Sequence, residues 1–299
     1  MTIHKPVLLQ ETITGLKLSP GIVAIDGTFG GGGHAREIIK NISPNGTYIG
    51  LDADVTAIGR EKEEINALAE EKEVKAILVV DNFRNVKECL PAEIVGNVNA
   101  VLLDLGFSSD QIENSGRGFS VLRDEPLQMT LADNSEFTVT DIVNSWDESE
   151  IEEILKEFGE EQFAPQIAKT ICDARKTGPI MRTAQLVELV KKATPEWYHH
   201  KKIHPATKTF QALRIAVNDE LGALRDFLPQ APVILASGGR LAIISFHSLE
   251  DRIVKQQFIA WERSGVAKRI NKKAIKPERE EILANRRSRS AKLRVCEFI

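Results

Sequence analysis

The fold class of this chain is indicated most clearly by a glycine-rich stretch, Asp26-Gly27-Thr28-Phe29-Gly30-Gly31-Gly32-Gly33-His34. It follows an apolar run, 22–25, which predicts a short buried strand, and it precedes 35–42, whose isoleucines recur on one side of a predicted helix. A strand, a glycine turn and a helix together are how α/β proteins hold an adenosine-containing cofactor. Glycine lets the ligand approach the backbone, and the helix N-terminus offers free N–H groups. We therefore expect a cofactor of this type at the turn.

The sequence of this turn is consistent with two kinds of cofactor, a dinucleotide and S-adenosylmethionine. Gly30, Gly32 and Ala35 match the Gly-x-Gly-x-x-Ala pattern of dinucleotide-binding proteins, and an acid, Asp52, stands near the expected distance. S-adenosylmethionine is favoured by Asp26, four residues before Gly30, which can bind the ammonium of the methionine moiety or fix the glycine turn. Four successive glycines also leave room for a bulky sulfonium. We expect S-adenosylmethionine, and a NAD-dependent oxidoreductase is the less favoured alternative.

The composition is that of a globular protein rather than a disordered or membrane-spanning one. The chain has 299 residues, of which 42% are hydrophobic and 27% charged, enough for one large domain or two ordinary ones. No apolar run approaches the roughly 20 residues that a membrane span needs, and the N-terminus lacks the apolar core of a signal peptide. The three cysteines are far apart, so we expect a reducing, cytoplasmic location.

Positive charge is concentrated near the C-terminus. The formal net charge is -4, yet residues 266–294 carry eleven basic and three acidic side chains. A local excess of this size is suited to binding phosphates, which indicates a nucleic-acid partner. A solvated tail is the other interpretation of such a run.

Acidic residues stand at the ends of three predicted strands. Strands are expected at 22–25, 47–51, 74–80, 98–103 and 240–246, with a final strand at 293–298. Asp26, Asp52 and Asp104 each follow one of them. In a doubly wound sheet the carboxyl ends of the strands line the ligand crevice, so Asp52 is placed to accept hydrogen bonds from both ribose hydroxyls. The alternative for Asp52 is the cap of the next helix.

The alternation of strands and helices stops after the strand at 98–103. From 105 to 212 the sequence shows helical patterns only, and a stretch of this length is too long for a loop inside a compact domain. We expect a helical domain inserted after the fourth strand, which divides the chain into 1–107, 108–211 and 212–299. A single helix is expected at 213–228.

Many long motifs follow one another in a fixed order along almost the whole chain. They include 104–111 (DLGFSSDQ), 117–120 (RGFS), 158–161 (FGEE), 204–207 (HPAT), 209–214 (TFQALR) and 244–252 (ISFHSLEDR), with the shorter 4–9 before the glycine turn and 285–294 at the end. In this set the chain resembles the bacterial 16S rRNA cytosine-N4 methyltransferases of the MraW/RsmH family.

The resemblance implies a class I, Rossmann-like methyltransferase sheet with an inserted helical domain. It implies S-adenosyl-L-methionine as the methyl donor, and a cytidine in the decoding region of 16S rRNA in the small ribosomal subunit as the acceptor. The residues that it implies as cofactor contacts are Gly32, Gly33, His34, Asp52, Phe83, Asp104 and Gln111. Phe83 would lie near the adenine, where an aromatic face stacks well.

The acceptor side of the site has three candidate residues. Asp104, just past the fourth strand, is the first candidate to shape the site that receives the cytosine amine, and Ser108 and Ser109 are the second candidates. Asp104 could instead serve the cofactor only. His247 could contact the RNA or could be structural.

Two further features of the sequence bear on catalysis and on metal binding. Gln128 and Thr130 replace an acid and a base that the family usually carries, and this is the support for a third hypothesis, a non-catalytic RNA-binding or ribosome-assembly factor. His199, His200 and His204 lack a completed ligand set and stand in a lysine-rich stretch, so we expect no zinc site.

Overall fold

The computed structural model describes residues 6–106, 115–132 and 135–299. The chain forms two compact units, Met1–Phe107 with Leu221–Ile299, and Ser108–Glu220. We call the first the sheet unit and the second the helical unit. Within the described residues, none of the helices is both long and apolar enough to cross a bilayer.

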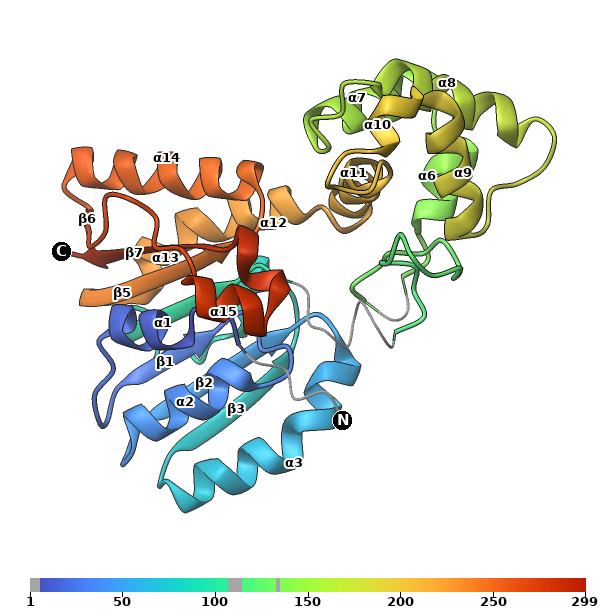
Figure 1. Ribbon diagram of the computed structural model, residues 1–299. Helices are drawn as coiled ribbons and strands as arrows, with labels where there is room; N and C mark the ends of the chain where they lie inside the picture. Colours follow the sequence, from blue (N-terminus) through green and yellow to red (C-terminus); the bar gives the residue numbers. More distant parts are fainter. Residues whose placement is uncertain (1–5, 107–114, 133–134) are drawn as a thin grey trace. The chain divides into compact units, whose positions relative to one another are not determined.

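A seven-stranded sheet forms the centre of the sheet unit (Figure 1). Its strands are β1 (Val23–Asp26), β2 (Thr47–Asp52), β3 (Lys75–Val80), β4 (Val98–Asp104), β5 (Leu235–Ser245), β6 (Ala267–Arg269) and β7 (Lys292–Phe298). The spatial order is β3-β2-β1-β4-β5-β7-β6. The first five strands in this order run parallel, and β7 is antiparallel to both of its neighbours.

The strand order reverses beside β1, which makes this the switch point of the sheet. β1 pairs with β2 on one side and with β4 on the other. In a doubly wound sheet such a switch point opens a crevice outside the carboxyl ends of the strands. Asp26, Asp52 and Asp104 are the last residues of β1, β2 and β4. The three acids therefore reach the same edge of the sheet, as predicted.

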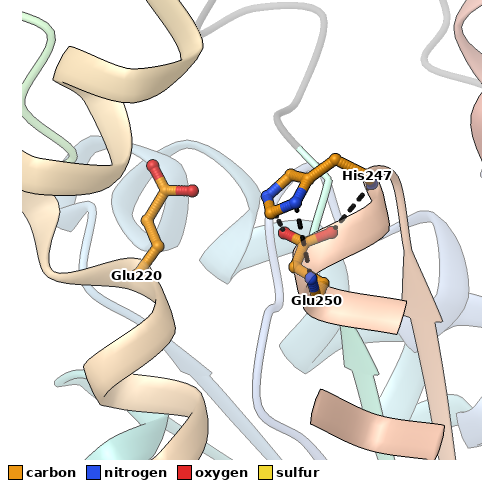
Figure 2. Close-up of side chains that lie close together, drawn as sticks. All are labelled: Glu220, His247 and Glu250. Carbon is orange, nitrogen blue, oxygen red and sulfur yellow. Dashed lines mark hydrogen bonds and ion pairs between the residues drawn. The ribbon is translucent and has the colours of Figure 1, made fainter. Parts of the chain in front are cut away.

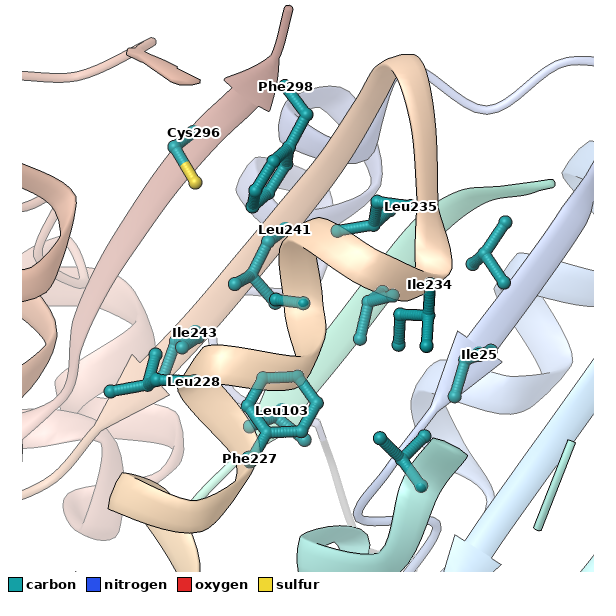
Figure 3. Packing of buried hydrophobic residues seen from close by; sticks show 14 of the residues in the cluster. Ile25, Leu103, Phe227, Leu228, Ile234, Leu235, Leu241, Ile243, Cys296 and Phe298 are labelled. Carbon is teal, nitrogen blue, oxygen red and sulfur yellow. The ribbon is translucent and has the colours of Figure 1, made fainter. Parts of the chain in front are cut away.

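Helices cover both faces of the sheet because neighbouring residues of a strand point to opposite faces. Ile25 and Leu103 pack in one core with Phe227, as Figure 3 shows. Ala24 and Leu102 pack in the core on the other face. The helices of this unit are α1 (Leu9–Leu16), α2 (Gly33–Ile42), α3 (Val55–Glu71), α4 (Val86–Cys89), α12 (Glu220–Phe227, from Leu221 on), α13 (Ala231–Ile234), α14 (Ser248–Ser264) and α15 (Arg279–Ala284), with short 3-10 turns η1 (Phe83–Asn85), η2 (Leu228–Gln230) and η3 (Arg286–Ser290).

The helical unit has a hydrophobic core of its own. Its helices are α6 (Val139–Ser145), α7 (Glu148–Glu157), α8 (Ala164–Arg175), α9 (Thr183–Ala193), α10 (Glu196–His199) and α11 (Thr207–Asn218). Ile151, Ile167 and Leu186 are fully buried in this core, and they belong to the stripes from which helices were predicted. The predicted fold class, a Rossmann-like α/β sheet with a helical insertion after the fourth strand, is confirmed.

Two predicted boundaries in this region are wrong. The predicted helix 213–228 is two helices, because Asp219 adopts a left-handed conformation with φ 47° and ends α11. The division expected between residues 211 and 212 falls inside α11, and the helical unit continues to Glu220. Phe210 and Leu213, on either side of the predicted division, are both buried in the helical core, so this helix cannot be split between units.

Candidate active site

The glycine turn is fixed by the carboxylate of Asp26. Only 1% of this residue is exposed. Its Oδ1 accepts a hydrogen bond from the Thr28 amide at 3.2 Å, and its Oδ2 accepts one from the Tyr48 hydroxyl at 3.3 Å. Of the two roles that the sequence left open for Asp26, the structure therefore shows the fixing of the turn.

Glycine is required at two positions of this turn by its backbone conformation. Gly30 and Gly32 have φ of 54° and 68°, in the left-handed region where a side chain is strained. No side chain caps α2 at Gly32, so its first turn keeps the donor groups that suit a helix N-terminus to anions and polar ligands. Gly33 and His34 form the start of this helix.

Asp52 connects the end of β2 to the glycine turn. Its Oδ2 accepts from the Gly30 amide at 2.7 Å and its Oδ1 accepts from the Asp54 amide at 2.9 Å. Both carboxylate oxygens of Asp52 thus accept from backbone amides, which ties the end of β2 to the glycine turn. The helix-cap alternative for Asp52 is wrong, because Asp54 caps α3 and accepts from Thr56 and Ala57.

An aromatic ring lies beside the same turn. Phe83 begins η1, just after β3, and its ring meets Phe227 edge to face with centroids 6.0 Å apart. A Cβ at Gly27 would lie 2.5 Å from Cδ2 of Leu103 and 3.2 Å from the Cβ of Phe83, so a side chain there would force these neighbours to shift. The ring is half-buried, and its contact with adenine stays a prediction.

Sequence reasoning missed one acid at this edge of the sheet. Asp81 follows β3 directly, and its Oδ1 accepts from the Asn82 amide at 2.7 Å and from Asn85 at 2.8 Å. The rule that selected Asp26, Asp52 and Asp104 also applies to Asp81, so its position after a strand was the signal. Its carboxylate holds the loop that carries Phe83.

Asp104 and His34 form a buried pair between β4 and α2. Oδ2 of Asp104 lies 3.7 Å from Nδ1 of His34, and Oδ1 of Asp104 accepts from the Gly106 amide at 3.2 Å. The Asp104 amide donates to Oγ1 of Thr28 at 2.6 Å, which joins the end of β4 to the glycine turn. Nε2 of His34 lies 3.2 Å from the carbonyl oxygen of Val7.

Two carboxyl groups of the site have unusual proton affinity. Burial raises the pKa of Asp104 from its ordinary value of 3.8 to about 7, and the negative charge of Glu250 adds to the rise. Burial likewise raises the pKa of Asp26 to about 7, with Asp104 and Asp52 as contributing charges. Near neutral pH, Asp104 can therefore both hold a proton and release one.

This proton affinity predicts how stability depends on pH. Asp104 binds its proton more tightly in the folded protein than in the unfolded chain, so its contribution to stability is complete below about pH 4. That contribution is lost as the pH rises through about 7. Asp104→Asn cannot ionise and should flatten the fall in unfolding free energy between about pH 4 and 7 by a few kcal/mol. Urea denaturation of the cofactor-free protein at a series of pH values measures this slope.

The control is Asp124→Asn. The exposed Asp124 pairs with Arg182, which lowers the pKa of its carboxyl, so its removal should leave the slope between pH 4 and 7 as in the parent. An Asp104→Asn protein with an unchanged slope would show that Asp104 is ionised throughout this range.

His247 caps α14. Its Nδ1 accepts from the Glu250 amide at 3.4 Å, and Oε2 of Glu250 accepts from the His247 amide at 3.2 Å and from the Phe246 amide at 2.7 Å. Figure 2 shows the imidazole beside the Glu250 carboxylate. Glu220, also drawn there, belongs to the helical unit and pairs with Arg214 at 2.8 Å. The structural interpretation of His247 therefore has direct support.

The three histidines near α10 have separate partners. Nε2 of His199 lies 2.9 Å from the Thr194 hydroxyl, His200 pairs with Glu196 at 3.7 Å, and Nδ1 of His204 accepts from the Ala206 amide at 3.2 Å. Among the described residues they do not converge on a common metal-binding point.

Three predicted site residues, Ser108, Ser109 and Gln111, lie outside the described residues. Gln128 and Thr130 are described: Gln128 is exposed, whereas Thr130 is 4% exposed. Between them Met129 is buried in the helical core, so this segment has a packing role that does not depend on the missing acid and base.

Part of the basic segment near the C-terminus supports the fold. Arg294 and Lys292 pair with Asp251, and Arg269 pairs with Glu262, so these cations support the fold of the sheet unit. Others are exposed, including Arg286 and Arg289 on η3. Of the whole basic segment, the exposed residues are therefore the ones that stay candidates for binding phosphates.

Fold and site together define a Rossmann-like α/β protein with the strand-end acids and glycine turn of an adenosine-type cofactor site. Comparison with known proteins gives the family. The model of the MraW methylase family matches residues 1–299. The chain belongs to this family and is a methyltransferase.

The relatives match this chain along nearly its whole length. The chain is 42% identical over 311 residues to the ribosomal RNA small subunit methyltransferase H of Clostridioides difficile (strain 630), covering 99% of each chain. It is 43% identical over 306 residues to the protein of that name from Symbiobacterium thermophilum, covering 97% of this chain and 95% of the relative. The Dictyoglomus thermophilum protein is 42% identical over 297 residues, covering 99% and 97%.

Proposed function

We propose that the protein methylates the exocyclic N4 amine of a cytidine in the decoding region of 16S rRNA, with S-adenosyl-L-methionine as donor. The observation that carries the proposal is the position of Asp104. Its carboxyl lies at the end of β4, next to His34, and its backbone is bonded to Thr28 of the glycine turn. The names of the relatives, which are ribosomal RNA small subunit methyltransferases, support the substrate class. Such a substrate implies action in the cytoplasm.

The residues at the edge of the sheet fit the donor. Asp52, at the end of β2, is the proposed acceptor of the ribose hydroxyls, Phe83 offers a ring for the adenine, and the start of α2 at Gly33 offers backbone donors. Gly32 and His34, at the turn and the start of α2, are also proposed to contact the donor. Asp104 and Gln111 are the remaining proposed donor contacts. The bound donor supplies an electrophilic methyl carbon, so the protein has chiefly to align the acceptor and exclude water.

The chain's own chemistry centres on the amine of the acceptor. The lone pair of the cytosine amine is delocalised into the ring, so a carboxylate that accepts its N–H bonds favours the geometry needed for attack. As the new N–C bond forms, the nitrogen must lose one proton. Ionised Asp104, with a pKa of about 7, can accept it. Ser108 is proposed as a second residue of the acceptor site.

Incubation of small ribosomal subunits with methyl-labelled donor tests this function. The subunits should come from cells that lack the enzyme, so that the acceptor position is unmodified. We expect label in 16S rRNA that depends on the enzyme. Tight binding to the subunit without label would favour a non-catalytic assembly factor, and preferential binding of NAD in equilibrium dialysis would favour an oxidoreductase.

The exposed arginines of η3 give a prediction about salt dependence. Arg286→Ala combined with Arg289→Ala should weaken binding to 16S rRNA and reduce the slope of log affinity against log salt by roughly 1.5, because each lost phosphate contact removes about 0.7–0.9. Cofactor affinity should not change. Filter binding at several salt concentrations measures the slope.

A matched control removes two lysines that are already paired. Lys40 and Lys72 pair with Glu37 and Glu71, and Lys40 lies at the end of α2 that is remote from the glycine turn. Their double alanine variant should keep the parental slope. If both variants behave alike, η3 does not contact the RNA backbone.

A further inference from the structure

A second surface with the chemistry of a nucleic-acid contact lies on the helical unit. It is centred on α10 and consists of Trp197, Lys201 and Lys202, which we call the α10 surface. Trp197 is 55% exposed, although tryptophan is on average highly buried in folded proteins. Its neighbour Tyr198 is only 5% exposed, so α10 is attached to the unit by one aromatic residue and presents the other.

The exposed ring is held in a fixed position. Trp197 meets Phe163 and Tyr198 edge to face, with centroids 5.9 Å apart in each pair. The Tyr198 hydroxyl donates to Oε2 of Glu161 at 2.7 Å, and Oε1 of the same carboxylate accepts from the Phe163 amide at 3.0 Å. Glu161 is itself 3% exposed. A buried carboxylate thus orients two of the rings that support Trp197.

Basic residues are concentrated in the sequence around Trp197. Residues 191–204 contain four lysines and one acid, Glu196, and Glu196 pairs with His200. Nζ of Lys201 lies 4.8 Å from the centroid of Trp197 and 4.7 Å from that of Tyr198. Among the residues that the structure describes, no carboxylate forms an ion pair with Lys201 or Lys202. Their charges are therefore available to an anionic partner.

This arrangement fits an unpaired strand of nucleic acid. Proteins that bind single strands combine aromatic rings, on which bases stack, with cations that follow the backbone. A lysine over an exposed ring contributes less than a base stacked on that ring. Lys201 can thus exchange its contact with Trp197 for a phosphate while a base takes its place. The ring needs no rearrangement, because its neighbours already fix it.

We infer that the α10 surface binds an unpaired segment of the RNA substrate, with one base stacked on Trp197 and the phosphates beside it held by Lys201 and Lys202. The inference rests on the proposed function for the identity of the partner. It adds a contact on the helical unit to the contacts proposed for the acceptor site and for η3.

Three variants of the full chain test it: Trp197→Ala, Trp197→Phe, and Lys201→Ala combined with Lys202→Ala. Their affinity for a fluorescein-labelled single-stranded RNA of about 12 nucleotides, which spans a typical single-strand site, is measured by anisotropy at several salt concentrations. Trp197→Ala should weaken binding about tenfold, and Trp197→Phe should retain most of the affinity, because phenylalanine keeps a stacking face. The double lysine variant should reduce the salt slope by about 1.4.

Matched controls come from the same unit. Met181 is 50% exposed, so Met181→Ala removes a comparable exposed apolar side chain. Lys156 and Lys176 pair with Glu152 and Asp173, so their double alanine variant removes two charges that are already balanced. Both controls should bind RNA as the parent does. Cofactor affinity should be the same in all variants, and thermal unfolding should show that each variant is folded at the assay temperature.

The outcomes separate this inference from the proposed function. If the parent labels small subunits and Trp197→Ala binds the RNA as tightly as the parent, the α10 surface is not an RNA site and the proposed function stands. If the parent transfers no methyl group but Trp197→Ala weakens RNA binding, the surface stands and the function fails. If Trp197→Ala weakens binding to whole subunits but not to RNA alone, the surface contacts a ribosomal protein and the inference is wrong.

Discussion

Asp104→Asn should lower the rate of methyl transfer at saturating donor and RNA by about 100-fold or more. Asparagine keeps the shape of the side chain but loses the negative charge and cannot accept a proton. Loss of one preorganised electrostatic contact to a reacting group typically costs 10²- to 10³-fold. The backbone bond from Asp104 to Thr28 does not involve the substituted carboxyl, so the glycine turn should persist. Single-turnover transfer of labelled methyl to small subunits measures the effect.

The rate at saturating donor distinguishes the two roles of this residue. If Asp104 shapes the acceptor site as well as contacting the donor, the rate of Asp104→Asn at saturating donor should stay low, whatever the change in donor Kd. If Asp104 serves the cofactor only, the Kd should rise and the rate at saturating donor should recover. Full transfer at ordinary donor concentration would refute the placing of the acceptor site at the end of β4.

Asp52→Ala should raise the donor Kd by at least about 100-fold. The variant removes the proposed acceptor of the ribose hydroxyls and also the acceptor of the Gly30 amide. Hydrogen bonds to a charged group contribute about 1.5–3 kcal/mol each, and two of them account for a loss of this size. Isothermal titration with the donor measures the Kd. Because Asp52 is not proposed to touch the acceptor, much of the transfer rate should return at saturating donor.

Asp54→Ala is the matched control for this prediction. Asp54 is two residues away and caps α3 through Thr56 and Ala57, so its loss should cost about 1 kcal/mol of stability. The amide of residue 54, which donates to Asp52, remains in the variant. Its donor Kd should therefore stay near the parental value. Equal losses of donor affinity in the two variants would mean that Asp52 acts only by holding the local backbone.

The central features of the sheet unit could be predicted because they depend on local sequence. The backbone of the glycine turn is left-handed at residues 30 and 32. Because glycine is the residue that adopts this conformation without strain, the turn can be recognised in the sequence by its glycines. Buried parallel strands appear as apolar runs, so the acids that end β1, β2 and β4 could be located. The same rule applied to every strand would also have found Asp81.

The roles of individual polar side chains could not be predicted, because their partners are distant in sequence. Asp26 is held by Tyr48, and Arg294 by Asp251, across 22 and 43 positions. Whether Arg294 was a phosphate ligand or part of an ion pair depended on that pairing. The end of α11 was missed for a different reason. Asp219 is a non-glycine residue in the left-handed region, and apolar periodicity continues across it.

The identity of the methylated nucleoside tests the central claim most directly. Small subunits that lack the modification are incubated with the enzyme and donor, and the 16S rRNA is then digested to nucleosides and analysed by mass spectrometry against synthetic standards. If the proposed function is right, the digest contains N4-methylcytidine, which is confined to a fragment from the decoding region and is absent when the enzyme is Asp104→Asn. A methyl group on C5 of cytidine or on another nucleotide, or no methylated nucleoside from an enzyme that binds both donor and subunit, would contradict it.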